Sequence, residues 1–143
     1  MESRDAAAWV GMRHRLWPDA SVEDLASTVA AYFSGGTPFL AVAFVAARET
    51  DAVGFIEISI RAYVPGAAVN PAPHVEGWYV EPAFQGRGIG RLLMKGAESW
   101  AVAHGHAQLG SDVLIENTGS ADAHKRLGFR EIERVCFFVK DLR

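Results

Sequence analysis

Residues 85–91 read Gln-Gly-Arg-Gly-Ile-Gly-Arg, and this stretch decides the fold. It follows a strand-like run that ends near Val80 and opens the clearest amphipathic helix of the chain. Glycines at every second position let the backbone turn tightly, so that consecutive N–H groups can point at one anion. The helix beginning at about Ile89 adds the positive end of its dipole, and Arg87 and Arg91 add charge. The stretch therefore predicts a cradle for a phosphate-bearing ligand.

Two common nucleotide-binding loops fit this stretch poorly. A Walker A loop requires a lysine followed by Ser or Thr after its last glycine, and this loop has neither. A dinucleotide-binding loop requires Gly-x-Gly-x-x-Gly at the first strand-to-helix turn. Here the spacing is Gly-x-Gly-x-Gly, and three strand candidates precede it. The spacing therefore argues against both ligand classes.

The composition predicts one globular domain over residues 1–143. Half of the 143 residues are hydrophobic and 22% are charged, so the chain can bury a sizeable core. The net charge of −3 argues against a nucleic acid partner and suits a cationic small substrate. No apolar run is long enough to span a bilayer, so no membrane partner is expected. The lone cysteine, Cys136, is typical of a reducing cytoplasm, and the histidines lack ligand spacing, so no metal is expected.

The hydrophobic pattern predicts a mixed α/β order of elements. Helices are expected at residues 5–16, 22–33, 89–104 and 117–127, and strands at 38–46, 56–60, 74–81, 107–114 and 132–139. Pro18, Gly35-Gly36, Gly105 and Gly128 end the four helices. A proline-rich loop over residues 63–73 is long enough to be functional. Cys136 is expected in the core of the last strand.

Two motifs, in this order, resemble the GNAT superfamily of N-acetyltransferases. The first is Val-Glu-Pro-Ala-Phe-Gln-Gly-Arg-Gly-Ile-Gly at residues 80–90, and the second is a helix ending Leu-Gly-Phe at residues 127–129. The resemblance covers residues 76–129 and implies acetyl-CoA as co-substrate, with its pyrophosphate on the loop amides. It also implies the GNAT fold, a central mixed and mostly antiparallel sheet flanked by helices.

The chain departs from the superfamily pattern in two places. Members begin with a strand, whereas the helix at residues 5–16 leaves little room for one, so we expect the first strand to be truncated or missing. A missing edge strand leaves a sheet edge open to a second copy and predicts a homodimer. His124 stands where many members have the tyrosine that protonates the leaving thiolate. It is either that acid or a structural histidine.

A closer resemblance extends over almost the whole chain, to the bacterial aminoglycoside 6'-N-acetyltransferases of type I, which are antibiotic-resistance enzymes. It is carried by short motifs in sequence order: Leu16-Trp17-Pro18, Gly54-Phe55, Ser59-Ile60-Arg61, Glu76-Gly77, Ser111-Asp112, Glu116-Asn117-Thr118, Leu127-Gly128-Phe129 and Glu133-Arg134-Val135. The resemblance implies acetyl transfer from acetyl-CoA to the 6'-amine of an aminoglycoside.

The same resemblance implies a set of site residues. Those expected to bind the acceptor are Trp17, Tyr63, Glu76, Asp112 and Glu133. Those expected to bind acetyl-CoA are Trp78, Tyr79, Val80, Gly86, Arg87, Gly88, Ile89, Gly90, Arg91 and Asn117. Glu76 and Asp112 are expected to be catalytic, Glu76 as the general base and Asp112 by holding the amine. A backbone N–H near Val80 is expected to receive the thioester carbonyl.

The chemistry of these residue types fits a cationic acceptor. Several carboxylates can replace the water and counterions of a polycation, and an amine must lose a proton before it attacks a thioester. Each carboxylate also has a plainer interpretation as a solvated or ion-paired surface charge, Glu133 above all because Arg134 can neutralise it. Trp17 and Tyr63 can equally be packing aromatics.

Three functions remain consistent with the sequence. The first is an aminoglycoside 6'-N-acetyltransferase in the cytoplasm. The second keeps the chemistry and replaces the acceptor by a polyamine, an amino acid or a protein amine. The third is an acyl-CoA-binding sensor without turnover, which would have no need of carboxylates at positions 76, 112 and 133.

Overall fold

The computed structural model describes residues 1–35 and 39–142, and the chain separates into two compact units, Met1–Ser111 and Asp112–Arg143. Along the first unit the elements are, in order, a 3-10 turn (Ser3–Asp5), α1 (Ala6–Leu16), α2 (Val22–Phe33), β1 (Val42–Arg48), β2 (Asp51–Arg61), β3 (Ala72–Val80), a second 3-10 turn (Pro82–Phe84), α3 (Ile89–Ala103) and β4 (Gly110–Ser111). The predicted strand start at Pro38 and the predicted helix end at Gly36 lie outside the described residues.

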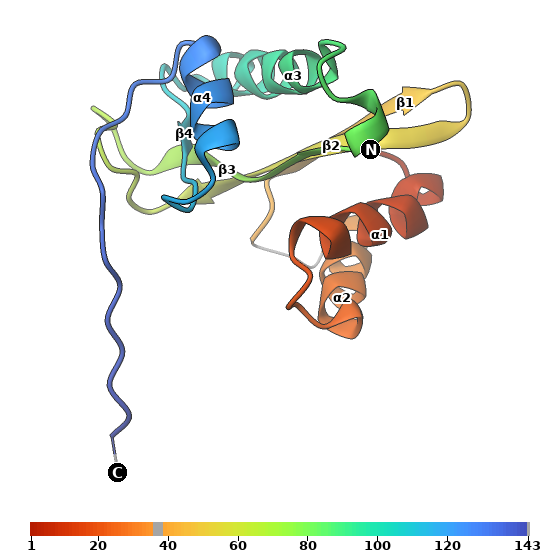
Figure 1. Cartoon of the computed structure of the whole chain (residues 1–143), viewed down its shortest axis with the longest axis horizontal. Helices are drawn as coiled ribbons and strands as arrows, with labels where there is room; N and C mark the ends of the chain where they lie inside the picture. The colour runs from red at the N-terminus through yellow and green to blue at the C-terminus, as the bar shows by residue number, and fades with distance from the viewer. Residues whose placement is uncertain (36–38, 143) are drawn as a thin grey trace. The chain divides into compact units, whose positions relative to one another are not determined.

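The sheet has the order β1-β2-β3-β4, and its first three strands are antiparallel whereas β4 runs parallel to β3. This confirms the predicted mixed, mostly antiparallel sheet. Figure 1 shows α1 and α2 on one face of the sheet and α3 on the other. The core between the sheet and the first two helices consists of Trp9, Met12, Val29, Leu40, Ala43 and Phe55. Burial of these side chains on one face provides the main stabilisation of this layer.

The helix boundaries follow local sequence signals. Ser21 caps α2, because its Oγ accepts the Asp24 N–H at 3.0 Å. α3 begins at Ile89, as predicted, and the following Gly105 adopts a positive φ of 81°. In the described residues no helix is both long and apolar enough to cross a membrane.

A β-bulge interrupts the β2–β3 ladder at Glu76. The pairing passes from Glu57–Gly77 to Ile58–Val75, so Glu76 is the extra residue on β3. A bulge bends the strand and re-aims the side chain of the unpaired residue. Glu76 therefore reaches the polar groups of β2 instead of standing in regular alternation.

The second unit contains α4 (Thr118–Arg126), capped by Asn117, whose side-chain oxygen accepts the Ser120 N–H at 3.1 Å. Two predicted strands differ from the structure. The strand expected at 107–114 is reduced to β4, and residues 129–142, including the strand expected at 132–139, have no helix or strand. A strand forms only where a neighbouring strand takes its backbone hydrogen bonds. Cys136 is exposed, so its prediction as a core residue was wrong.

Candidate active site

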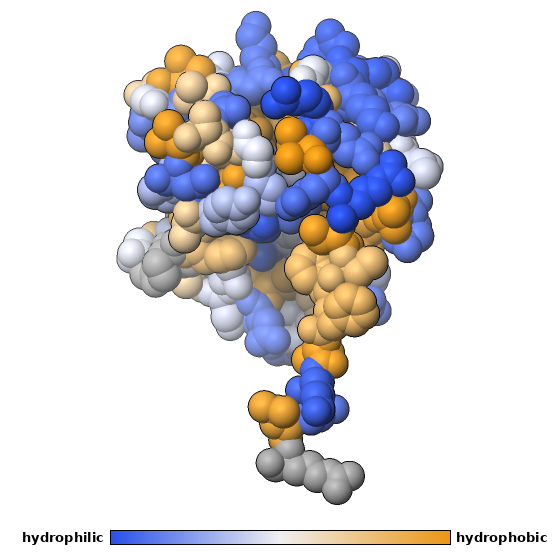
Figure 2. Space-filling view, turned by 90° about the vertical axis from the view of Figure 1, so that its left-hand side faces the viewer, coloured by the Kyte–Doolittle hydropathy of each residue, from blue (hydrophilic) through white to orange (hydrophobic). Residues whose placement is uncertain are grey.

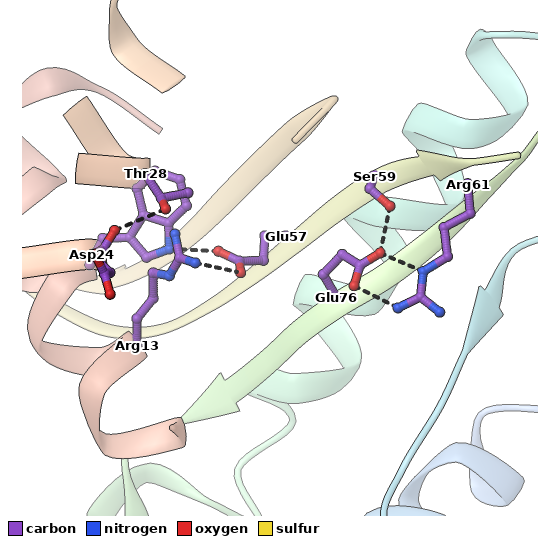
Figure 3. Close-up of polar contacts among 8 residues, drawn as sticks. Arg13, Asp24, Thr28, Glu57, Ser59, Arg61 and Glu76 are labelled. Atoms are coloured by element: carbon purple, nitrogen blue, oxygen red, sulfur yellow. Dashed lines mark hydrogen bonds and ion pairs between the residues drawn. The ribbon is translucent and has the colours of Figure 1, made fainter. Parts of the chain in front are cut away.

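Glu76 lies at the centre of a polar cluster on β2 and β3 (Figure 3). Arg61 holds both oxygens of the carboxylate, with Nε 2.7 Å from Oε1 and Nη2 2.7 Å from Oε2. Ser59 Oγ donates to Oε1 at 2.5 Å, and His74 Nδ1 lies 3.5 Å from the same oxygen. The Glu76 side chain is only 10% exposed. Because two side chains clamp it, the carboxylate has a fixed orientation.

The partners of Glu76 keep it ionised. Burial alone would raise its pKa, but the nearby His74, the hydrogen bonds from Arg61 and Ser59 and the charge of Arg61 outweigh burial. The pKa of Glu76 therefore lies well below its usual range. The same contacts lower its basicity, so the carboxylate is well suited to hold a cation and is a weak proton acceptor.

Sequence reasoning did not single out Ser59, Arg61 and His74 as partners of Glu76. The available signal was alternation, since residues 57, 59 and 61 share one face of β2. Pairing of Ser59 with His74 then places His74 on the same face. The pairing could not be deduced from the sequence, because a bulge shifts the register by one residue between Glu57 and Ile58.

Trp17, predicted to bind the acceptor, lies against β3 next to Glu76. A Cβ on Gly77 would stand 2.8 Å from Trp17 Cη2, so only glycine lets the indole approach this closely. The Trp17 ring also contacts Phe55 edge-on, with 6.4 Å between centroids. Trp17 therefore packs on Gly77, the residue that follows Glu76 on β3.

The glycine loop connects β3 to α3 as predicted. Gly86 and Gly88 have φ values of 73° and 83°, and Gly88 is the N-cap residue of α3. A side chain would strain either position. The loop is tied to the strand, because Gln85 Nε2 donates to the Val80 carbonyl at 3.0 Å. The N-terminus of a helix and a glycine-rich turn fit a pyrophosphate.

The loop also packs on Trp78, whose Nε1 donates to the Gly90 carbonyl at 3.2 Å. Arg87 and Arg91 are exposed, and the Arg87 guanidinium lies 5.7 Å from the centre of the Phe84 ring. Both predicted cationic side chains therefore remain on the surface of the loop, beside the α3 N-terminus.

The backbone of β3 has the polarity that a thioester site requires. The Glu81 N–H donates to the Val53 carbonyl across β2, at 2.9 Å. Backbone groups alternate between the two edges of a strand, so the N–H groups of Val80 and Trp78 face the edge away from β2. Within the first unit the β3–β4 ladder covers only His74–Gly110 and Val75–Ser111. Tyr79 directs its hydroxyl to Glu81 Oε2, at 3.1 Å.

The other predicted residues have these positions. Tyr63 is 69% exposed on the loop between β2 and β3. Asp112, Asn117 and Glu133 belong to the second unit, where Asp112 and Glu133 are exposed. Arg134 pairs with Glu131, at 2.6 Å.

His124 has a structural environment within the second unit. Its Nδ1 lies 2.8 Å from the Ser120 carbonyl oxygen, which requires the proton on Nδ1 in the neutral ring. The imidazole packs edge-on against Phe129, with 5.1 Å between centroids. These contacts join α4 to the Gly-Phe motif that follows it.

Comparison with known proteins agrees with this geometry. The Acetyltransferase (GNAT) family matches residues 9–129. An aminoglycoside N(6')-acetyltransferase type 1 from Klebsiella aerogenes is 37% identical, over 99% of this chain and 94% of the relative. A protein of the same name from Stenotrophomonas maltophilia is 40% identical, over 94% of this chain and 86% of the relative.

Among solved structures, AAC(6')-Iy in complex with the bisubstrate analog CoA-S-monomethyl-acetylneamine is similar to this chain. It has a TM-score of 0.90 and 32% sequence identity, over 99% of this chain and 95% of that one. Aminoglycoside 6'-N-acetyltransferase AAC(6')-IG from Acinetobacter haemolyticus has a TM-score of 0.88 and 28% identity, over 100% and 97% of the two chains.

Proposed function

The chain belongs to the GNAT family of acetyltransferases, and from that membership we propose that it acetylates the 6'-amine of aminoglycoside antibiotics and confers resistance to them. The observation that carries the proposal is the 37–40% identity to two aminoglycoside N(6')-acetyltransferases over nearly the whole chain. The geometry supports it, because Glu76 is held ionised on β3 and the Trp17 ring lies against Gly77, the next residue of that strand. A cationic sugar requires both kinds of contact.

Acetyl-CoA, when bound, supplies the acetyl group as a thioester. The acetyl group would move from the sulfur to the amine nitrogen, while the amine loses a proton and the thiol gains one. Gly86 to Arg91, with the α3 N-terminus, hold the pyrophosphate. The Trp78, Tyr79 and Val80 backbone binds the rest of the arm, and the Val80 N–H receives the thioester carbonyl. Asn117 is a further proposed cofactor-binding residue. Most of the rate comes from holding amine and thioester together.

Glu76 is the proposed catalytic residue of β3, in two roles. It binds the 6'-ammonium group, for which its permanent charge is suited. It then accepts the proton of the amine directly or through a water molecule, as general base. The ammonium group first loses one proton to solvent, which leaves the neutral amine that attacks. A weak base then suffices for the second proton, because nitrogen becomes positively charged as it bonds to the carbonyl carbon and the C–S bond breaks. Asp112 holds the amine, and Trp17, Tyr63 and Glu133 bind the sugar rings and other amines.

The experiment compares thiol release from acetyl-CoA with tobramycin and with a matched analogue that carries a 6'-hydroxyl. We expect turnover with the amine and none with the hydroxyl analogue. Turnover only with spermidine or a lysine peptide would show that the acceptor is a polyamine or a protein amine and not an aminoglycoside. Binding of acetyl-CoA without turnover on any amine would make the protein a sensor.

We also propose that residues 1–143 act as a single acetyltransferase domain in the cytoplasm. The family match at residues 9–129 spans both compact units, which supports a single domain. The lone cysteine, which is exposed, suits a reducing compartment, and acetyl-CoA is an intracellular co-substrate.

Two copies of the chain are further proposed to form a homodimer through residues 129–142. Phe137, Phe138 and Val139 are 93–95% exposed, and Figure 2 shows hydrophobic atoms along this C-terminal segment. A contiguous exposed apolar segment marks an interaction site. Sedimentation velocity is expected to give a dimer for the wild type and a monomer for Phe138→Asp. Val102→Asp, on exposed α3 surface, is the control. A monomeric wild type contradicts the proposal. If Val102→Asp gives a monomer and Phe138→Asp does not, the interface lies on α3 instead.

A further inference from the structure

Trp9, Arg13 and Trp17 recur at intervals of four along α1 and its C-cap, so their side chains share one face of the helix. The Arg13 guanidinium lies between the two indoles. Its central carbon is 5.7 Å from the centre of the Trp9 ring and 5.3 Å from that of Trp17. Both distances are within the range of cation–π attraction. Arg13 therefore links a core tryptophan to the tryptophan at the acceptor site.

The core end of this link is rigid. Trp9 is fully buried, and it contacts Tyr32 and Phe33 edge-on. Its Nε1 donates to Glu57 Oε2 at 3.1 Å. Glu57 is fully buried on β2, and its Oε1 lies 3.7 Å from Arg13 Nη2. Burial raises the pKa of Glu57 to about 7 against the charge of Arg13 and the Trp9 hydrogen bond.

This cluster is not an efficient way to stabilise a fold. Arg13 is 5% exposed, and within the described residues its Nε and Nη1 atoms have no hydrogen-bond partner. Glu57 Oε1 is also without a hydrogen bond there. Buried polar atoms without partners are costly, and apolar side chains of similar volume often stabilise a core as well or better. The cluster therefore calls for a role other than packing.

The Arg13 guanidinium contacts the Trp17 ring, which lies at the surface end of the cluster. This ring lies over Gly77, the neighbour of Glu76 on β3, and Glu57 Cγ is 3.2 Å from the Cβ position of the same glycine. We infer that Arg13 is a positioning residue, which holds Trp17 against β3 so that the aromatic ring and Glu76 face the same acceptor. The inference rests on the proposed function, because it assigns Trp17 to acceptor binding.

The test uses steady-state kinetics of acetyl transfer to tobramycin by Arg13→Met and Arg13→Lys. Arg13→Met is expected to raise the KM for tobramycin about 3- to 30-fold, the range of one desolvated cation–π contact. The KM for acetyl-CoA is expected to change less than about twofold. Arg13→Lys keeps the charge beside Glu57 and loses the planar group, so it gives a smaller rise.

A double variant separates positioning from stability. Arg13→Met/Trp17→Ala is expected to have the same tobramycin KM as Trp17→Ala, because Arg13 acts through Trp17. Arg4→Met, which removes an exposed arginine paired with Glu2, is the matched control and leaves both KM values unchanged. Additive effects in the double variant, or a lower melting temperature with an unchanged tobramycin KM, would overturn the inference. If Arg13→Met does not fold, Arg13→Lys takes its place, and the tobramycin KM of Arg13→Lys/Trp17→Ala is compared with that of Trp17→Ala.

A second readout does not depend on turnover. In protein labelled with 5-fluorotryptophan, the ¹⁹F resonance of Trp17 is identified by its loss in Trp17→Phe. Arg13→Lys is expected to shift or broaden this resonance more than that of Trp78, which bonds to Gly90. A wild type without turnover on tobramycin refutes the proposed function, whereas an unmoved Trp17 resonance refutes the role of Arg13.

Discussion

Glu76→Gln is expected to lower kcat/KM for acetyl transfer to tobramycin by about 10²–10⁴-fold, the usual contribution of a general acid or base. Glutamine has nearly the same shape, and its carbonyl can still accept from Ser59. It cannot carry the negative charge that holds the ammonium group, nor accept its proton. Its amide group would also face the Arg61 guanidinium, so the clamp at Oε2 is lost. Steady-state kinetics with both substrates measures the effect.

The loss of kcat/KM in Glu76→Gln should come from its effect on the acceptor amine and not from a change in the fold. We expect acetyl-CoA to bind Glu76→Gln with a dissociation constant close to that of the wild type, because the glycine loop is unchanged. A variant with wild-type kcat/KM would remove Glu76 from the reaction. Loss of acetyl-CoA binding together with activity would indicate a structural role instead.

Arg61→Gln provides the companion measurement, a pH profile of kcat/KM. Removing the guanidinium removes the interactions by which Arg61 lowers the Glu76 pKa, so that pKa rises. In the proposed mechanism the ionised carboxylate is the active form, so the acid limb of the profile is expected to move to higher pH. An acid limb that stays in place would show that Glu76 does not control it.

The same pKa shift affects stability, with a defined sign. The folded-state pKa of Glu76 lies below 4.5, the ordinary value for a glutamate in an unfolded chain. The stabilisation from this group is therefore complete above about pH 4.5 and is lost as the pH falls through the lower folded-state value. Glu76→Gln should flatten this part of the dependence of unfolding free energy on pH.

Gly77→Ala is expected to destabilise the fold by about 1–3 kcal/mol and to raise the tobramycin KM. The new Cβ would lie 2.8 Å from Trp17, 3.1 Å from Phe55 and 3.2 Å from Glu57. Phe55 and Glu57 are fully buried and have no room to move, so overpacking has its usual cost. Trp17 is the partly exposed neighbour and is displaced. Thermal unfolding should show a midpoint about 4–12 °C lower.

Gly96→Ala is the matched control. Gly96 lies within α3, and a Cβ there would stand 3.8 Å from Phe44, an ordinary contact. Alanine in a helix interior is favoured over glycine, so the midpoint should stay the same or rise. The expectation for Gly77 is wrong if its alanine variant keeps the wild-type midpoint and tobramycin KM.

Much of the fold follows from short-range signals. The start of α3 at Ile89 agrees with the prediction, and Ser21 and Asn117 cap α2 and α4 through side-chain contacts with residues only three positions away. The alternation over residues 56–60 identified β2, although the strand is longer, Asp51–Arg61. The apolar run at 132–139 did not become a strand, because a strand also depends on a partner that a local pattern does not contain.

The sequence by itself determined the donor side of the reaction. The glycine spacing at residues 85–91 and the helix that follows are local, so their chemistry can be recognised without coordinates. Only the tertiary structure decided how the proposed acceptor residues Glu76 and Trp17 are held. The clamp of Glu76 by Arg61 joins residues 15 positions apart, and the bulge at Glu76 sets the register between their strands. Arg13 and Trp17 are close in sequence, but Trp17 packs on Gly77 of a distant strand. Their geometry depends on strand register and on packing of α1 against the sheet, neither of which a single segment specifies.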